Sequence, residues 1–94
     1  MFNGIIFNKG VVIKSSKRSK GINIFVKSDL RLTSKDIGVS ISCDGVCLTL
    51  ISIQKKIMEF YLSNETVERS KFKYLKKNDK INLELPLKYG HKIS

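Results

Sequence analysis

Short runs in which apolar and polar residues alternate make up most of the chain. Residues 22–26 (INIFV) alternate with a period of two, which is typical of a strand with one buried face. A strand is also expected over 5–13, interrupted at 8–10 (NKG), and the two runs are predicted to pair as a first hairpin. Residues 28–38 are then expected to form a polar loop.

A second hairpin is the clearest local prediction. Residues 39–43 (VSISC) alternate, and Asp44-Gly45 supplies the pair of residues that a tight type I′ turn needs. Residues 46–53 are therefore expected to run back beside 39–43. After a turn at 54–56 (QKK), a fifth strand is predicted over 57–62.

A short helix is predicted after the fifth strand. Either Ser63 or Asn64 can act as its N-cap, since both side chains can accept a hydrogen bond from a free backbone amide. Glu65 would then place a negative charge in the first turn, where it complements the exposed amides. We expect the helix to end no later than Phe72.

The last predicted strand, 80–85 (KINLEL), ends at Pro86, which has no amide hydrogen to donate to a sheet. Six short strands without a helix long enough to cover a sheet favour an all-β fold, a closed or nearly closed antiparallel barrel that hides its edges. An oligonucleotide-binding type of barrel fits the same pattern. Residues 1–94 are predicted to form one domain, and the stretch 88–94 is interpreted as a linker that enters something further.

The net charge of +10 at pH 7 raises the question of an acidic partner such as nucleic acid. Only three of the 18 cations are arginine, although phosphate recognition favours the guanidinium fork. The densest clusters, within 14–20 and 73–80, fall between predicted elements, and we interpret them as solvated turns. A nucleic-acid partner is therefore not expected from the sequence.

Hydrophobic residues make up 41% of the chain, which is enough for a core. No apolar run approaches the roughly 20 residues of a spanning helix, and residues 1–10 lack the features of a signal peptide. We expect a cytoplasmic protein without a membrane partner.

The two cysteines are predicted to be unpaired. In a two-residue hairpin Cys43 faces Val46 and Ser42 faces Cys47, so the two thiols point to opposite sides of the sheet and a disulfide is geometrically poor. With His91 as the one histidine, a zinc site is not supported. Each cysteine is interpreted as a small buried hydrophobe, and the residues alone indicate a small basic barrel without a recognisable catalytic set.

Three motifs in order resemble the riboflavin synthase family. Residues 1–5 (MFNGI) are similar to the family's Met-Phe-Thr-Gly-Ile opening. Residues 40–50 (SISCDGVCLTL) resemble its Ser-x-x-x-(Asn/Asp)-Gly-(Val/Cys)-Cys-Leu-Thr-Val core. Residues 65–70 (ETVERS) look like Glu-Thr-Leu-Arg-x-Thr, and 75–84 (LKKNDKINLE) follow as a match to Leu-Lys-x-Gly-Asp-x-Val-Asn-Leu-Glu.

The resemblance implies a known architecture and reaction. Family members have two six-stranded Greek-key barrels and a C-terminal helix, assemble as trimers, and use no metal or redox cofactor. They dismutate two molecules of 6,7-dimethyl-8-ribityllumazine into riboflavin and a ribitylamino-pyrimidinedione, between the N-terminal barrel of one subunit and the C-terminal barrel of another. This chain is expected to be the N-terminal lumazine-binding barrel, ending at Ser94 before a family histidine and the second barrel, and to form a homodimer as such a fragment.

The resemblance also assigns catalytic positions. Phe2 would lie against the reacting heterocycle, and Gly4 and Ile5 would support the ligand through their backbone. Ser40 and Cys47 match polar residues implicated in catalysis.

Further positions would bind the substrate. Thr49 and Thr66 would contact the edge of the pteridine ring, while the Ser63 backbone and Glu65 would meet the ribityl hydroxyls. A polyol needs several converging donors and acceptors, and a flat uncharged ring needs fixed edge contacts, so the residue types suit such a ligand.

Three positions depart from the family pattern. Asn3 replaces the usual Thr and Glu68 stands where Arg is common, which leaves the roles of both open. Asn78 replaces a turn glycine, a mild change because Asn tolerates the left-handed region.

Three functional readings follow. In the favoured one, the chain is the N-terminal half-site of the enzyme and is inactive alone; in the second it is a non-catalytic lumazine or flavin carrier of the antenna type. A basic nucleic-acid-binding barrel is a distant third.

Overall fold

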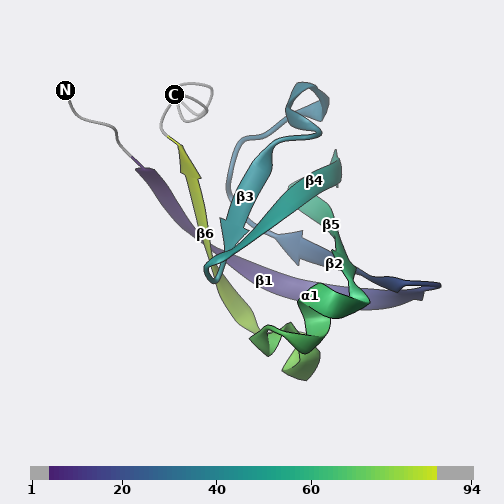
Figure 1. Cartoon of the computed structure of the whole chain (residues 1–94). Helices are drawn as coiled ribbons and strands as arrows, with labels where there is room; N and C mark the ends of the chain where they lie inside the picture. Colours follow the sequence, from purple (N-terminus) through teal and green to yellow (C-terminus); the bar gives the residue numbers. More distant parts are fainter. Residues whose placement is uncertain (1–4, 87–94) are drawn as a thin grey trace.

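A computed structural model describes residues 5–86, which form a closed antiparallel barrel of six strands in the order β1-β2-β5-β4-β3-β6 (Figure 1). The strands are β1 (Ile5–Arg18), β2 (Gly21–Lys27), β3 (Ser40–Cys43), β4 (Val46–Gln54), β5 (Ile57–Ser63) and β6 (Lys80–Pro86). The barrel closes because β6 pairs with both β1 and β3. The predicted fold class is therefore confirmed, and the predictions on Phe2, Gly4 and His91 lie outside the described residues.

The first strand is longer than the sequence pattern indicated. It continues through 8–10 and then through the basic run 14–18, which had been assigned to a solvated turn. Its first half pairs with β6 and its second half with β2. At Gly10 the backbone of β1 approaches the core closely, because a Cβ there would come within 2.5 Å of Val26 Cγ1. A register shift between Val12 and Lys14 follows, and such an irregularity increases the local bend.

The second hairpin has the predicted turn. Asp44 and Gly45 have φ angles of 51° and 85°, as the two central residues of a type I′ turn require. Cys43 pairs with Val46 and Ser42 with Cys47, so the predicted register is confirmed. The turn before β5 also has two left-handed residues, Lys55 and Lys56.

Inward-facing side chains of all six strands fill the barrel. Within the described part of the chain, the core contains 17 buried hydrophobic residues, and the largest fully buried one is Phe60 of β5. Each such side chain stabilises the fold by roughly 1.5–3 kcal/mol. No helix among residues 5–86 is long and apolar enough to cross a membrane.

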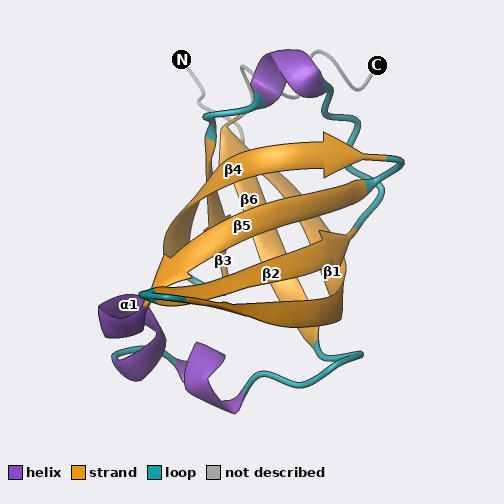
Figure 2. Ribbon diagram, turned by 90° about the vertical axis from the view of Figure 1, so that its right-hand side faces the viewer, coloured by secondary structure: helices purple, strands orange, loops and turns teal. Residues whose placement is uncertain are grey.

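Short helical segments close the two ends of the barrel (Figure 2). The 28–38 loop is more ordered than predicted, because Leu30 and Leu32 are buried and η1 (Ser34–Asp36) has a capping box built by Thr33 and Asp36. The opposite end carries α1 (Asn64–Glu68) and η2 (Lys71–Tyr74).

Candidate functional site

A strip of small polar side chains covers the outer face of β3 and β4. Because Ile41, Cys43, Leu48 and Leu50 point into the core, their neighbours in the strands point outward. The outward residues are Ser40, Ser42, Cys47 and Thr49. In the ladder Ser40 is opposite Thr49 and Ser42 is opposite Cys47, so the four share one surface.

The two residues assigned to catalysis are in contact on this surface. The Ser40 hydroxyl and the Cys47 thiol are hydrogen-bonded, and either group can be the donor. Cys47 is exposed, so the interpretation of this residue as a buried hydrophobe is wrong. An exposed thiol beside a hydroxyl can reach a ligand laid on the sheet.

Cys43 is the contrasting thiol. It is fully buried and donates to the backbone oxygen of Ile41 over 3.7 Å. Burial, with a smaller contribution from the neighbouring Asp44 and Cys47, raises the pKa of its thiol to about 12. Both cysteines are free, as predicted, and Cys43 is the structural one of the two.

In the first half of β4, Cys47 and Thr49 direct their backbone N–H and C=O groups away from β3. Cys43 and Val46 flank the two-residue turn and form a hydrogen-bonded pair, so Cys47 and Thr49 occupy the non-hydrogen-bonded positions opposite β3. The N–H and C=O groups of Cys47 and Thr49 therefore point toward β5. The ladder between β4 and β5 begins at Leu50, opposite Phe60, so Cys47 lies outside it and Thr49 is at its edge.

The start of α1 packs on β2 and β5 and is separated from β4 by a hollow. Ser63 is the N-cap: its hydroxyl oxygen accepts from the Thr66 amide over 3.2 Å and its hydroxyl lies 3.1 Å from the Thr66 hydroxyl. This selects Ser63 over Asn64 as the cap. Glu65 in the first turn is exposed and forms an ion pair of 3.2 Å with Arg69.

A hollow of about 340 Å³ lies between β4 and α1, and its lining brings two of the predicted binding residues together. Val46 forms the β4 side, and the helical side carries Glu65 and Thr66. The other predicted residues of these elements, Ser40, Cys47, Thr49 and Ser63, do not line the hollow. The sequence analysis missed the other lining residues, Arg69 and Ser70. The four-residue spacing from Glu65 to Arg69 on one helix face could have indicated the first of them.

The remaining predicted position is Ile5. It is the first residue of β1, where its backbone pairs with Pro86 of β6. The described residues thus place Ser40, Cys47 and Thr49 on one sheet face and Ser63, Glu65 and Thr66 at the adjoining start of α1. Together they offer hydroxyls, a thiol, a carboxylate and the backbone groups of Cys47 at the end of the β4–β5 ladder, a set suited to a flat ring with a polyol tail.

Comparison with known proteins identifies what the chain resembles. The pattern of the lumazine binding domain family matches residues 3–86. The riboflavin synthase of Chlamydia pneumoniae is 35% identical over 94 residues, which cover 99% of this chain and 47% of that protein. The riboflavin synthases of Photobacterium phosphoreum and Bacillus subtilis (strain 168) are 34% and 31% identical, and each match covers 89% of this chain and 39% of the relative. The chain thus spans less than half the length of these relatives.

Proposed function

The chain belongs to the lumazine binding domain family, and from that premise we propose that it binds one molecule of 6,7-dimethyl-8-ribityllumazine or riboflavin between β4 and α1. A lumazine-binding role follows from the family. The observation that supports this location of the binding site is the hollow lined by Val46 of β4 and by Glu65 and Thr66 of α1.

The strand edge suits the heterocycle. One edge of a pteridine alternates carbonyl and N–H groups, and the N–H and C=O groups of Cys47 and Thr49 are directed toward that side of β4. A strand edge offers donors and acceptors in alternation, so ring and edge are complementary. Ser40 and Cys47 would then lie beside the ring, on the outer face of the sheet.

The start of α1 suits the ribityl chain. The Glu65 carboxylate is exposed, so it can exchange its surface ion pair with Arg69 for hydrogen bonds from sugar hydroxyls. The hydroxyls of Ser63 and Thr66 belong to the same first turn as Glu65 and add further donors and acceptors. A polyol bound there meets a charged acceptor, the stronger kind of hydrogen-bond partner.

For catalysis we propose that the barrel supplies one of two half-sites. The dismutation moves a four-carbon unit from one lumazine to another, so the donor leaves as the pyrimidinedione and the acceptor becomes riboflavin. Holding two rings in a reactive orientation can contribute about 7–11 kcal/mol to such a reaction. One barrel with one site holds one ring, and we expect the isolated chain to form riboflavin at close to the uncatalysed rate.

Quenching of riboflavin fluorescence tests the binding proposal. We expect quenching at micromolar protein, and Glu65→Ala to weaken affinity about 10-fold, the cost of a hydrogen bond to a charged group. Glu68→Ala is the matched control, because this exposed acid in the same helix lies outside the hollow. Unchanged emission up to about millimolar riboflavin would refute binding, and equal losses in the two variants would refute the location.

A turnover assay tests the half-site proposal. The chain is incubated with 6,7-dimethyl-8-ribityllumazine, and riboflavin is followed by chromatography beside the riboflavin synthase of Bacillus subtilis. Equal turnover per chain would show that this barrel alone suffices and that the half-site proposal is wrong.

A further inference from the structure

Ten of the 18 cations lie in two segments, the second half of β1 with the turn to β2 and the residues from α1 to the start of β6, which the fold brings to one end of the barrel (Figure 2). They are Lys14, Lys17, Arg18, Lys20, Arg69, Lys71, Lys73, Lys76, Lys77 and Lys80. The β1–β2 turn is joined to α1 through a hydrogen bond from the Asn64 amide to the Lys20 carbonyl oxygen. The 78–79 turn is joined to β1 through two backbone hydrogen bonds with Val12.

Most of the cations around η2 are free of acidic partners. Arg69 pairs with Glu65, and Lys71 pairs with Asp44 over 3.3 Å. Within residues 5–86 no ion pair joins Lys73, Lys76, Lys77 or Lys80 to a carboxylate, and all four are exposed. This end of the molecule therefore carries a concentrated positive potential.

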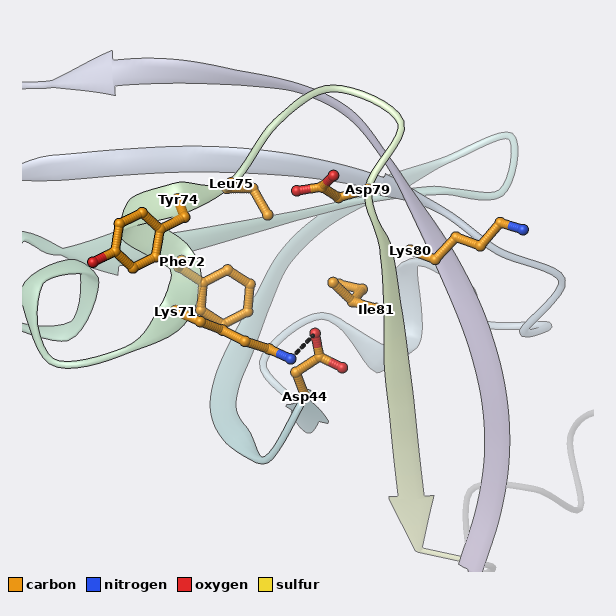
Figure 3. Close-up of a pocket in the computed structure, with 8 residues that line it drawn as sticks. All are labelled: Asp44, Lys71, Phe72, Tyr74, Leu75, Asp79, Lys80 and Ile81. Carbon is orange, nitrogen blue, oxygen red and sulfur yellow. Dashed lines mark ion pairs between the residues drawn. The ribbon is translucent and has the colours of Figure 1, made fainter.

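A hollow of about 240 Å³ opens among these cations (Figure 3). Its floor is apolar, formed by Phe72, Leu75 and Ile81. Asp79 adds a carboxylate, one oxygen of which accepts from the Lys76 amide over 2.8 Å. A flat group of the size of a nucleobase can enter such a space and meet both an apolar surface and an acceptor.

Tyr74 stands at the rim of this hollow. It is 70% exposed, an unusual state for a large aromatic side chain, and the Lys73 ammonium lies 5.2 Å from the centre of its ring. A second hollow of about 510 Å³ also has the tyrosine in its lining, so the ring borders open space in both hollows. An exposed ring with lysines around it is the arrangement by which proteins hold unpaired bases between a stacking platform and phosphate contacts.

We propose that this end of the barrel, which we term the Tyr74 face (residues 71–80), binds single-stranded nucleic acid. A base stacks on Tyr74, and the flanking phosphates contact Lys73, Lys76 and Lys77. An acidic polypeptide would match the charge but would leave the exposed ring and the apolar hollow without a partner. Duplex nucleic acid keeps its bases stacked and cannot offer one to the ring.

Fluorescence anisotropy of a labelled oligothymidylate tests this proposal. At about 0.15 M salt we expect micromolar binding that is weakened about 5- to 150-fold by Tyr74→Ala and retained by Tyr74→Phe, because stacking needs the ring. The pair Lys76→Gln, Lys77→Gln should lower the slope of log affinity against log salt by about 1.4, as two phosphate contacts are lost. Lys35→Gln, Lys55→Gln removes the same net charge at the opposite end of the barrel and is the control. It should keep the slope of the unaltered chain, because neither lysine contacts a phosphate in the proposal.

The alternatives are outcomes of the same experiment. Unchanged affinity in Tyr74→Ala, with an unchanged circular dichroism spectrum, would refute the proposal, and so would polyglutamate that binds as tightly and depends equally on Tyr74. Riboflavin quenching by Tyr74→Ala should equal that of the unaltered chain, because the Tyr74 face and the β4–α1 hollow share no lining residue. Failure of one proposal is thus distinguishable from failure of the other.

Discussion

Two cysteines four positions apart lie on opposite faces of the sheet, so one thiol is exposed to reagents and ligands and the other is part of the core. Cys43 is in the core, and Cys47 is on the surface against the Ser40 hydroxyl. The reactive species of a cysteine is the thiolate, and the raised pKa of Cys43 keeps that group protonated at neutral pH. The difference between the two thiols is therefore large enough to measure by chemical modification.

We expect an alkylating reagent at pH 8 to modify Cys47 in the folded chain and to leave Cys43 unmodified until the chain is unfolded. Peptide mapping by mass spectrometry after native and denaturing treatment gives both extents. Cys47→Ser is the control and should abolish native labelling. Rapid modification of Cys43 in the folded chain would contradict its position in the core.

The opposite orientation of the two thiols could be predicted because the Asp44-Gly45 turn fixes the register of the hairpin. Which thiol faces the core was missed, since cysteine is compatible with both environments. The buried Leu48 and Leu50 decide it, as they place Cys47 and Thr49 outside. The contributions of Arg69 and Ser70 to the hollow were missed because they depend on how α1 packs on β2 and β5, across the hollow from Val46.

At the scale of elements, the β2–β5 pairing limits what the start of β2 can hold. A Cβ on Gly21 would come within 2.0 Å of the carbonyl oxygen of Leu62, a backbone atom that cannot turn aside. Gly45 has open space around it but a φ of 85°, so its substitution introduces conformational strain without a clash. Substitution of Gly21 therefore tests the free-energy cost of a steric clash, and substitution of Gly45 tests the cost of a strained backbone conformation.

Gly21→Ala is expected to destabilise the chain by about 3 kcal/mol, the upper range for overpacking, and Gly45→Ala by about 1–2 kcal/mol. Denaturant titration gives both free energies of unfolding, provided that the slopes agree with the unaltered chain. A loss in Gly21→Ala no greater than that in Gly45→Ala would contradict the described packing of β2 on β5.

Most strands could be predicted because their apolar residues alternate, but the second half of β1 could not. Its sequence, KSSKR over 14–18, carries no apolar alternation. It is held as a strand by pairing with β2, from Lys14 opposite Phe25 to Arg18 opposite Gly21. Tertiary pairing overrides local sequence in this case.

For the whole molecule, the exposed face beside the candidate site raises the question of what covers it. Phe7 is 69% exposed and lies in one row with Glu84, Ser42 and Cys47, since each is opposite the next across β1, β6, β3 and β4. An aromatic side chain next to a binding surface commonly contacts a partner.

We therefore expect the chain to form a homodimer through this face, with one barrel covering the site of the other. Sedimentation equilibrium should give twice the 10.7 kDa mass of one chain, and Phe7→Lys should shift the equilibrium toward the monomer. A 10.7 kDa species at every concentration, with and without riboflavin, would contradict this expectation.

The closed barrel itself was predictable at this scale, because six short strands need a way to hide their edges. The gathering of ten cations at one end was not predictable, because residues 14–20 and 69–80 are distant in the sequence. Backbone hydrogen bonds bring the two segments together, from Asn64 to Lys20 and between Val12 and the 78–79 turn. Charge distribution of this kind depends on the complete topology.

The central claim is that a lumazine binds between β4 and α1. Amide chemical shifts of the isotope-labelled chain, recorded while 6,7-dimethyl-8-ribityllumazine is added, test it most directly. We predict that saturable shifts concentrate at Cys47, Thr49 and residues 63–66, while η1 at the other end of the barrel is unaffected. Shifts confined to the Tyr74 face, or no saturable shifts at millimolar ligand, would contradict the account.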